Sequence, residues 1–193
     1  MTSSTPKFQQ PKLHQFGALA SYEHWAELKN SYNEVLHLNH CQHMSINIYN
    51  NKDELLILSA NPNIGQHLAA SNTLRYDGTT SPSFYANRDF FWWEQAYEAG
   101  KSNIIKANKE WKYGLTDGII LSRKLKNYHV VYSFGFNLQK NKDPRNTKVE
   151  IEETKKQFIN MGNHCFSQIK HIAEHYLNDD LPDLSQRYLY AVK

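Results

Sequence analysis

The chain contains two pairs of short segments that are predicted to be β-strands, and in the first of these segments Met44, Ile46 and Ile48 alternate with polar residues. The first pair, at 44–48 and 54–59, flanks the polar turn residues 50–53 and predicts a β-hairpin. The second pair, at 118–122 and 129–136, flanks a charged turn and predicts another hairpin. We therefore expect a sheet of four or five antiparallel strands.

Two further segments repeat their apolar residues with the period of an α-helix. Between Tyr22 and Leu36, and again between Phe158 and Tyr176, apolar residues return every three or four positions, which predicts amphipathic helices. The segment 141–146 is predicted to be a loop. The order α-β-β-α-α-β-β-α is typical of an α/β (α+β) sandwich, with a central antiparallel sheet between helices as in PAS- and GAF-like sensor domains.

The length sets the domain organisation, because 193 residues suffice for one domain and are too few for two large ones. Residues 1–15 are polar with two prolines and are expected to be flexible. Residues 16–178 are expected to form the domain, and residues 179–193 a linker.

Composition excludes several classes of protein. The apolar content of 40% and the aromatic content of 13% are typical of a globular domain, and a net charge of +3 gives no field that by itself indicates nucleic acid or membrane binding. Cys41 and Cys165 lie far apart without CxxC spacing, so reduced thiols are expected. No apolar run has transmembrane length and the first residues lack a signal-peptide core. We expect a cytoplasmic protein with no membrane partner and no cofactor.

The segment from Asp77 to Gly118 carries the candidate chemistry. A carboxylate at Asp77, the aromatic run Phe90 to Trp93 and a glycine-bounded turn from Gly114 to Gly118 supply a polar anchor, apolar walls and a tight connection into a sheet. These are the components of a closed pocket for a small molecule. We therefore predict a protein that binds a ligand and is not an enzyme.

The order and spacing of these features resemble the autoinducer-binding domain of LuxR-type quorum-sensing transcription regulators, over about residues 20–178. In that family an Asp precedes a Trp by fifteen positions, as Asp77 precedes Trp92, and a helix ends in a Gly-hydrophobic-x-x-Gly turn, as it does from Gly114 to Gly118. The resemblance implies that Asp77 accepts a hydrogen bond from the amide N–H of an acyl-homoserine lactone. It also implies that Trp92 packs against that ligand.

Two positions depart from the family pattern. Ile64 and Leu68 stand where the family has the Trp and Tyr that hold the lactone and acyl carbonyls. We therefore expect a diverged pocket that binds ordinary acyl-homoserine lactones poorly and takes a small apolar or amide-bearing signal molecule. Further residues could supply a ring or a hydroxyl to such a pocket, although each also has an ordinary structural interpretation: Phe91, Tyr76, Tyr49 and Ser133.

The last residues resemble the beginning of another domain. Leu184-Ser185-Gln186-Arg187 is similar to the opening of the family's helix-turn-helix DNA-binding domain, with Tyr188 in place of a Glu. Residues 179–193 are thus expected to be a linker or the start of a helix-turn-helix domain that has been either truncated or lost. We expect DNA to be bound only through such a domain, which this chain does not include. A second copy of the chain is a further possible partner, which would give a homodimer.

Two other classes of function compete with the sensor. The cavity could be filled by side chains, which would leave a protein-interaction or dimerisation module. A zinc-dependent hydrolase is the more distant alternative, because 171–175 matches H-x-x-E-H and a second His/Cys cluster lies at 37–43. A cavity above about 200 Å³ that touches Asp77 and Trp92 would favour the sensor, and a filled core with a large exposed apolar patch the interaction module.

Overall fold

The computed structural model describes Phe8 and residues 11–17, 19–36, 38–70, 73–85, 88–125, 127–140, 144–177 and 181. Within these ranges it describes only the backbone at 39, 68–70, 140 and 144–147.

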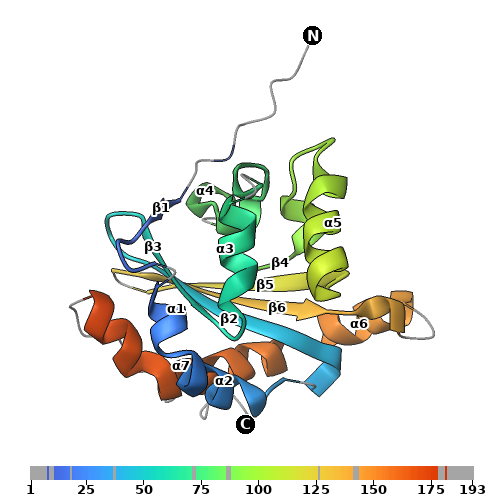
Figure 1. Ribbon diagram of the computed structural model, residues 1–193. Helices are drawn as coiled ribbons and strands as arrows, with labels where there is room; N and C mark the ends of the chain where they lie inside the picture. Colours follow the sequence, from blue (N-terminus) through green and yellow to red (C-terminus); the bar gives the residue numbers. More distant parts are fainter. Residues whose placement is uncertain are drawn as a thin grey trace.

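A six-stranded sheet forms the centre of the described part of the molecule (Figure 1). Its order is β1-β3-β2-β6-β5-β4, and every neighbouring pair is antiparallel except β1 with β3. The strands are β1 Lys12–Leu13, β2 Cys41–Tyr49, β3 Glu54–Ser59, β4 Phe90–Trp92, β5 Asp117–Lys124 and β6 His129–Phe136.

Both predicted hairpins are present. In the β2–β3 turn, the Asn50 side chain accepts hydrogen bonds from the backbone N–H groups of Lys52 and Glu54, which closes the turn. The second hairpin joins β5 to β6, and β6 pairs with β2 in the middle of the sheet.

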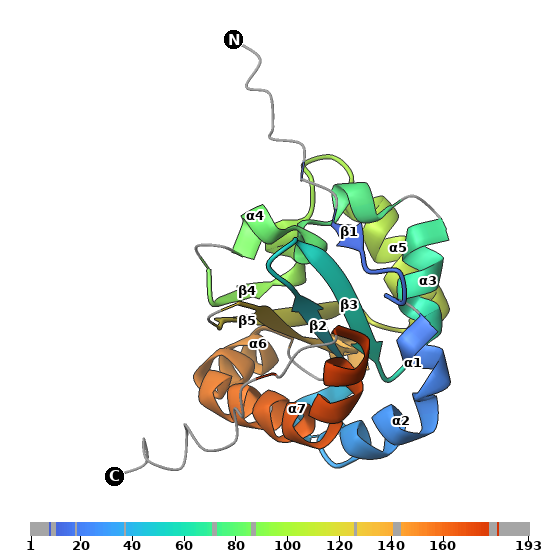
Figure 2. The same ribbon diagram turned by 90° about the vertical axis from the view of Figure 1, so that its left-hand side faces the viewer.

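Helices cover both faces of the sheet, which gives three layers (Figures 1 and 2). The helices on the first face are α2 Trp25–Asn33, α6 Pro144–Glu153 and α7 Lys155–Leu177, with α1 Leu19–Glu23 beside β3. Those on the second face are α3 Pro62–Ala70, α4 Pro82–Tyr85 and α5 Ser102–Tyr113, together with the short 3-10 turns η2 Leu74–Tyr76, η3 Gly78–Thr80 and η4 Trp93–Ala96. Two more 3-10 turns, η1 Leu38–His40 and η5 Leu138–Lys140, adjoin β2 and β6. This confirms the predicted sandwich.

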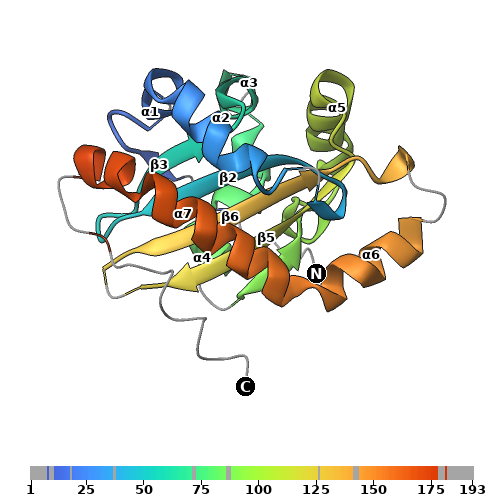
Figure 3. The same ribbon diagram turned by 90° about the horizontal axis from the view of Figure 1, so that it is seen from below.

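Each face of the sheet has its own hydrophobic core. Met44, Ile46 and Ile48 of β2 pack into the core under α2 and α7, whereas Phe91 and Ile120 pack into the core under α3 to α5. Because side chains alternate along a strand, residues that follow each other in β2 lie in different cores. The helix α7 crosses the first face (Figure 3).

Several boundaries differ from the predictions. Lys12 and Leu13 pair with β3, so the sheet extends into the segment predicted to be flexible. The helix predicted from Tyr22 to Leu36 is divided at His24 into α1 and α2. The helix α6 begins at Pro144, inside the loop predicted at 141–146, because proline is well suited to the first helical turn.

The predicted linker at 179–193 lies outside the described residues except for Leu181, which is buried against the first core. None of the helices in the described ranges is long and apolar enough to cross a membrane.

Close contact between α7 and the sheet depends on Gly162. A Cβ atom at this position would lie 2.3 Å from Cδ2 of the buried Tyr132 ring. We expect Gly162→Ala to lower the free energy of unfolding by about 1–3 kcal/mol, because the helix or the ring must move. Gly65→Ala is the matched control in α3, since its Cβ would meet nothing closer than Ile57 at 4.0 Å.

We expect that control to stabilise the protein by about 0.5–1 kcal/mol through helix propensity alone. Urea unfolding of both variants measures the difference, and equal effects of the two substitutions would show that α7 does not depend on this contact.

Candidate ligand-binding site

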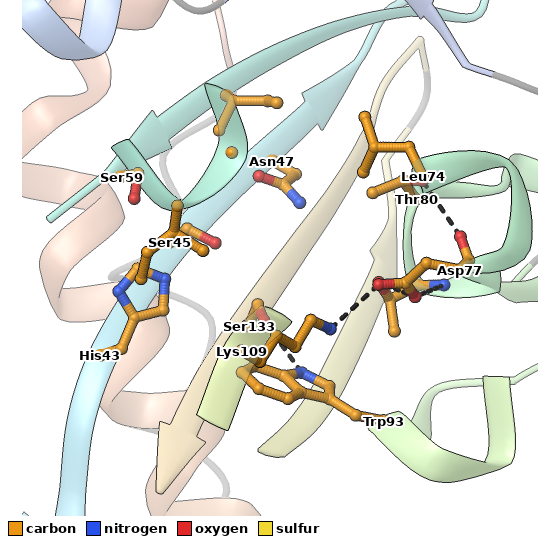
Figure 4. A pocket seen from close by; sticks show the side chains of 14 residues that line it. His43, Ser45, Asn47, Ser59, Leu74, Asp77, Thr80, Trp93, Lys109 and Ser133 are labelled. Atoms are coloured by element: carbon orange, nitrogen blue, oxygen red, sulfur yellow. Dashed lines mark hydrogen bonds and ion pairs between the residues drawn. The ribbon is translucent and has the colours of Figure 1, made fainter. Parts of the chain in front are cut away.

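A buried cavity of about 70 Å³ lies between the sheet and the helices of the second face (Figure 4). Its floor consists of side chains from β2, β3 and β6. Ile64 and Gly65 of α3 line it, as do η3 and the segment before it, and Lys109 of α5 reaches it from the side. Segments far apart in the sequence therefore meet at one site.

Three serines form a row across the floor of the cavity. Ser45 in β2 is paired with Ser59 in β3 on one side and with Ser133 in β6 on the other, and all three residues line the cavity. His43 and Asn47, two positions before and after Ser45, face the same way. The centre of a sheet that is covered on both faces thus carries a polar patch.

Asp77 stands at the start of η3, where protein groups bind both of its carboxylate oxygens. Its Oδ1 accepts hydrogen bonds from the backbone N–H and the hydroxyl of Thr79, and its Oδ2 lies 2.9 Å from Nζ of Lys109. The two charged side chains are 2% and 5% exposed. Asp77 and Lys109 therefore form a buried ion pair at the edge of the cavity.

Aromatic rings and a phenol hold the Lys109 ammonium group. Nζ lies 4.1 Å from the centroid of the Trp93 ring and donates a hydrogen bond to the Tyr97 hydroxyl over 3.2 Å. Burial raises the pKa of Tyr97, with the Asp77 charge adding to the effect, so its phenol stays protonated. Lys109 thus has an anion, a hydroxyl and a ring as partners.

Trp93 lies flat against the sheet because two glycines leave room for its indole. Gly118 and Gly135 are paired across β5 and β6, and a Cβ atom on Gly118 would lie 2.2 Å from the Trp93 ring. The indole N–H donates to the Ser133 hydroxyl over 3.2 Å. Gly114 ends α5 with a left-handed φ of 65°, which turns the chain into β5. The glycine motif therefore positions both Lys109 and the Trp93 ring.

Of the eight residues predicted for the site, Asp77, Ile64 and Ser133 line the cavity. Phe91 and Tyr49 belong to the same core without lining the cavity, and the Tyr49 hydroxyl donates to the Thr80 carbonyl. Tyr76 is half-buried beside Arg75 and Lys101 instead. The Leu68 side chain lies outside the described residues.

Trp92 lies on the opposite face of the sheet from the cavity. Its indole N–H donates to Glu152 of α6 over 2.8 Å, and its ring belongs to the first core. Side chains of β4 alternate, so Phe91 faces the cavity side and Trp92 does not; the chain then enters η4, which brings Trp93 back. The placement of Trp92 at the pocket is therefore corrected to Trp93.

Lys109, His43 and Asn47 are among the cavity residues that were not predicted from the sequence. Lys109 lies four positions after Ile105 and four before Tyr113, on the inward face of α5, and a lysine within an apolar stripe was the available signal. His43 was considered only as a metal ligand, and Asn47 not at all. Their signal is a polar alternation, His43-x-Ser45-x-Asn47, in a strand that has helices on both faces.

His43 is held as a neutral imidazole. Burial, together with repulsion from Lys109, lowers its pKa to about 4. The side-chain oxygen Oδ1 of Asn47 is buried without a hydrogen-bond partner. Tyr85, Asn137 and Asn163 also carry such a buried side-chain atom, but the one on Asn47 belongs to a residue that lines the cavity, where a water molecule or a ligand can satisfy it.

An outer cleft of about 340 Å³ adjoins the cavity. Lys29 of α2, Gln42 of β2, and Lys112 and Tyr113 of α5 are among its walls, and His43 and Ile64 line both spaces. These two side chains are the boundary between the cavity and the molecular surface on this side.

In the described ranges, no group of three or more His, Cys, Asp or Glu side chains could hold a metal ion. In the H-x-x-E-H segment, Glu174 instead pairs with Lys170 and accepts a hydrogen bond from the backbone N–H of Leu181. Burial raises the pKa of both Cys41 and Cys165 to about 12, so neither thiol is an activated nucleophile.

No family model and no curated protein sequence matches this chain. Among solved structures, SdiA in complex with octanoyl-rac-glycerol aligns over 86% of this chain and 66% of its own length, with a TM-score of 0.52 and 11% identity. Escherichia coli SdiA in the space group P6522 aligns over 88% and 73%, with a TM-score of 0.54 and 10% identity. The VqsR ligand-binding domain from Pseudomonas aeruginosa aligns over 76% and 89%, with a TM-score of 0.46 and 13% identity.

SdiA has a LuxR-type autoinducer-binding domain, and at these identities its structures show the fold alone. The chain thus has the fold of the LuxR-type autoinducer-binding domains, which confirms the fold that the sequence resemblance implied. It spans only about two thirds of the SdiA chain in the octanoyl-rac-glycerol complex, 66% of its length.

The buried ion pair can be tested by removing one partner and then both. We expect Lys109→Met to lower the free energy of unfolding by about 3–5 kcal/mol, because it leaves the Asp77 carboxylate buried without a counter-charge. The double variant Lys109→Met/Asp77→Asn should be more stable than the single one, since the Asn oxygen can still accept from Thr79. A double variant no more stable than Lys109→Met would contradict this account, and denaturant unfolding provides all three values.

The neutral His43 predicts a loss of stability in mild acid. Between pH 6.5 and 4 the unfolded chain binds a proton at His43 that the folded chain does not, so stability falls as the pH falls through this window. At about 1.4 kcal/mol per pKa unit, the loss approaches about 3 kcal/mol. In His43→Gln this part of the pH dependence should be missing, and unfolding curves at several pH values compare the two proteins.

Proposed function

We propose that this chain is the small-molecule-sensing domain of a LuxR-type transcription regulator with a diverged ligand pocket. The observation that carries the proposal is the buried cavity beside the sheet, at which the Asn47 Oδ1 atom has no partner. Binding a molecule at this place would satisfy the orphaned acceptor and complete the second core. The domain would bind its signal without transforming it.

Asp77 would act mainly through Lys109 and η3 in this proposal. A carboxylate has about four acceptor positions, and Thr79 and Lys109 occupy three of those on Asp77. A ligand N–H could use the remaining one, as the family resemblance implies. Ile64, Ser133 and Trp93 would contribute the adjoining wall.

The size of the cavity implies that binding is coupled to movement. A volume of about 70 Å³ holds a few water molecules and is well below the roughly 300–1,000 Å³ of pockets for drug-sized ligands. A larger ligand would have to displace Ile64 and His43 toward the outer cleft. A ligand that binds only this folded form stabilises it by mass action, which gives the domain a ligand-dependent stability.

The remaining parts of the regulator follow from the same proposal. It would work in the cytoplasm, and DNA would be bound only through a helix-turn-helix domain. SdiA is recorded with octanoyl-rac-glycerol, a small uncharged molecule, and the proposed signal is of that general size or smaller. A homodimer would be the form in which such a regulator meets DNA.

One observation favours a second candidate function. The cavity is smaller than the 200 Å³ that we set as the mark of a sensor, and it does not touch Trp92. A domain with so little internal space could instead serve as a protein-interaction or dimerisation module. Its surface does expose large apolar side chains, with Trp111 86% exposed.

Native mass spectrometry of freshly purified protein separates the two functions. A small molecule that co-purifies, and that is lost from a variant with a filled cavity such as Ser45→Leu, supports the sensor. Protein that carries no molecule, and whose melting temperature no small molecule raises, supports the interaction module instead. Lys52→Leu is the control, because it introduces the same side chain in the exposed β2–β3 turn, away from both cores.

Ordinary acyl-homoserine lactones are expected to bind weakly. Ile64 lines the cavity where the family pattern has a hydrogen-bonding aromatic side chain, and each carbonyl buried without a donor costs about 1–3 kcal/mol. Calorimetric titration with a series of acyl chain lengths tests this. A submicromolar dissociation constant for any of them would contradict the assignment of a diverged pocket.

A further inference from the structure

The polar face of β2 is the feature of the cavity that the fold alone does not explain. His43, Ser45 and Asn47 point to the same side of the central strand and are 6%, 8% and 7% exposed. Apolar residues at these positions would pack against α3 and α5 without loss of hydrogen bonds. Buried polar groups lower stability unless they are paired, so their presence here indicates that they have a partner in some state of the protein.

The unused hydrogen-bonding capacity at the cavity is concentrated on this strand. Asn47 Oδ1 has no partner, and within the described ranges neither the Ser45 hydroxyl nor the His43 imidazole makes a side-chain hydrogen bond. The other two serines of the row are engaged, because Ser133 accepts from Trp93 and Ser59 accepts from the backbone N–H of Asn61. The β2 side chains are therefore available to a ligand.

The charges at the cavity compensate one another. Asp77 and Lys109 form an ion pair in which both side chains are almost fully buried, and the His43 imidazole is neutral at pH 7. An anionic or cationic ligand group would have no counter-charge left to meet it, and an unpaired buried charge is strongly unfavourable. The cavity is therefore suited to an uncharged group.

We propose that His43, Ser45 and Asn47 recognise an uncharged ligand group that carries hydroxyls, in particular two hydroxyls on adjacent carbons. A hydroxyl both donates and accepts, so it can donate to Asn47 Oδ1 while it accepts from Ser45, whereas a carbonyl can only accept. Inward residues two positions apart on a strand are about 7 Å apart, a gap that a diol between them can bridge. The inference rests on the proposed function, whose ligand class it names.

The boundary residues give a diol with a short alkyl chain a way to fit. His43 and Ile64 line both the cavity and the outer cleft, so a chain attached to the diol can lie past Ile64 with its head group on β2. This geometry selects the probes, three six-carbon molecules that differ only in the head group: 1,2-hexanediol, 1-hexanol and hexanoate.

The chain contains its own reporter for this site. It has four tryptophans, and of these only Trp93 lines the cavity; Trp92 lies in the opposite core, and Trp25 and Trp111 are exposed. We expect 1,2-hexanediol to shift the Trp93 indole N–H signal in ¹⁵N-resolved NMR spectra, with an affinity about three- to tenfold higher than that of 1-hexanol. Hexanoate should leave this signal in place, and the other three indoles serve as internal controls.

Two variants connect the preference to β2. Ser45→Ala and Asn47→Leu should each weaken 1,2-hexanediol about three- to tenfold and abolish its advantage over 1-hexanol. Ser31→Ala, which removes a buried hydroxyl in α2 away from the cavity, is the matched control and should bind all three probes as the unaltered protein does. If Asn47→Leu does not fold, Ser45→Ala alone tests the inference, because it removes a single oxygen atom and disturbs the packing least.

The inference is overturned by three results: equal affinities for the diol and the carboxylate, a diol preference that survives in Ser45→Ala, or no shift of Trp93 with any probe. The proposed function is judged separately by the molecule that co-purifies. A charged or hydroxyl-free molecule at the cavity would leave the sensor intact and remove the diol inference, and no molecule at all would remove both.

Discussion

The second face of this molecule depends on one buried ion pair. Asp77 precedes η3 and Lys109 lies in α5, so the ion pair between them joins two segments that are distant in sequence. The ammonium group also lies over Trp93, whose indole rests on Gly118 and is bonded to Ser133. Since a buried charge needs its partner, this contact fixes where α5 lies relative to the sheet, and with it the wall of the cavity.

The same arrangement explains how a sheet with two covered faces can contain a polar site. The first face of the sheet is filled by aliphatic and aromatic side chains beneath α7, and it carries most of the apolar packing. The second face can then accommodate His43, Ser45 and Asn47 without loss of the fold, because the opposite core supports the strand. One face of β2 thus contributes apolar packing, and the other face carries the polar side chains at the cavity. A ligand that satisfies the polar face would add to the stability of the folded protein.

The residues Phe90 to Trp93 show how far the sequence could locate the site. An aromatic run after a carboxylate was enough to predict a pocket near Asp77, yet which indole faces the pocket depended on a short strand and on the 3-10 turn after it. One residue more or less in β4 would exchange Trp92 and Trp93 between the two cores. The Ile64 and Ser133 predictions did not depend on such a boundary, and both residues line the cavity.

The sequence by itself determined the two hairpins, the helix that closes the first face, the layered fold and the segment that carries the site. These follow from periodicity and turn chemistry, which are local properties of the chain. Only the tertiary structure decided that Lys109 neutralises Asp77, that the polar residues of β2 are buried, and that the cavity is small. Those outcomes depend on contacts between residues distant in sequence: alternation in β2 reads as a half-exposed strand until α3 and α5 are placed above it, and only then do Ser45 and Asn47 become buried groups that need a partner.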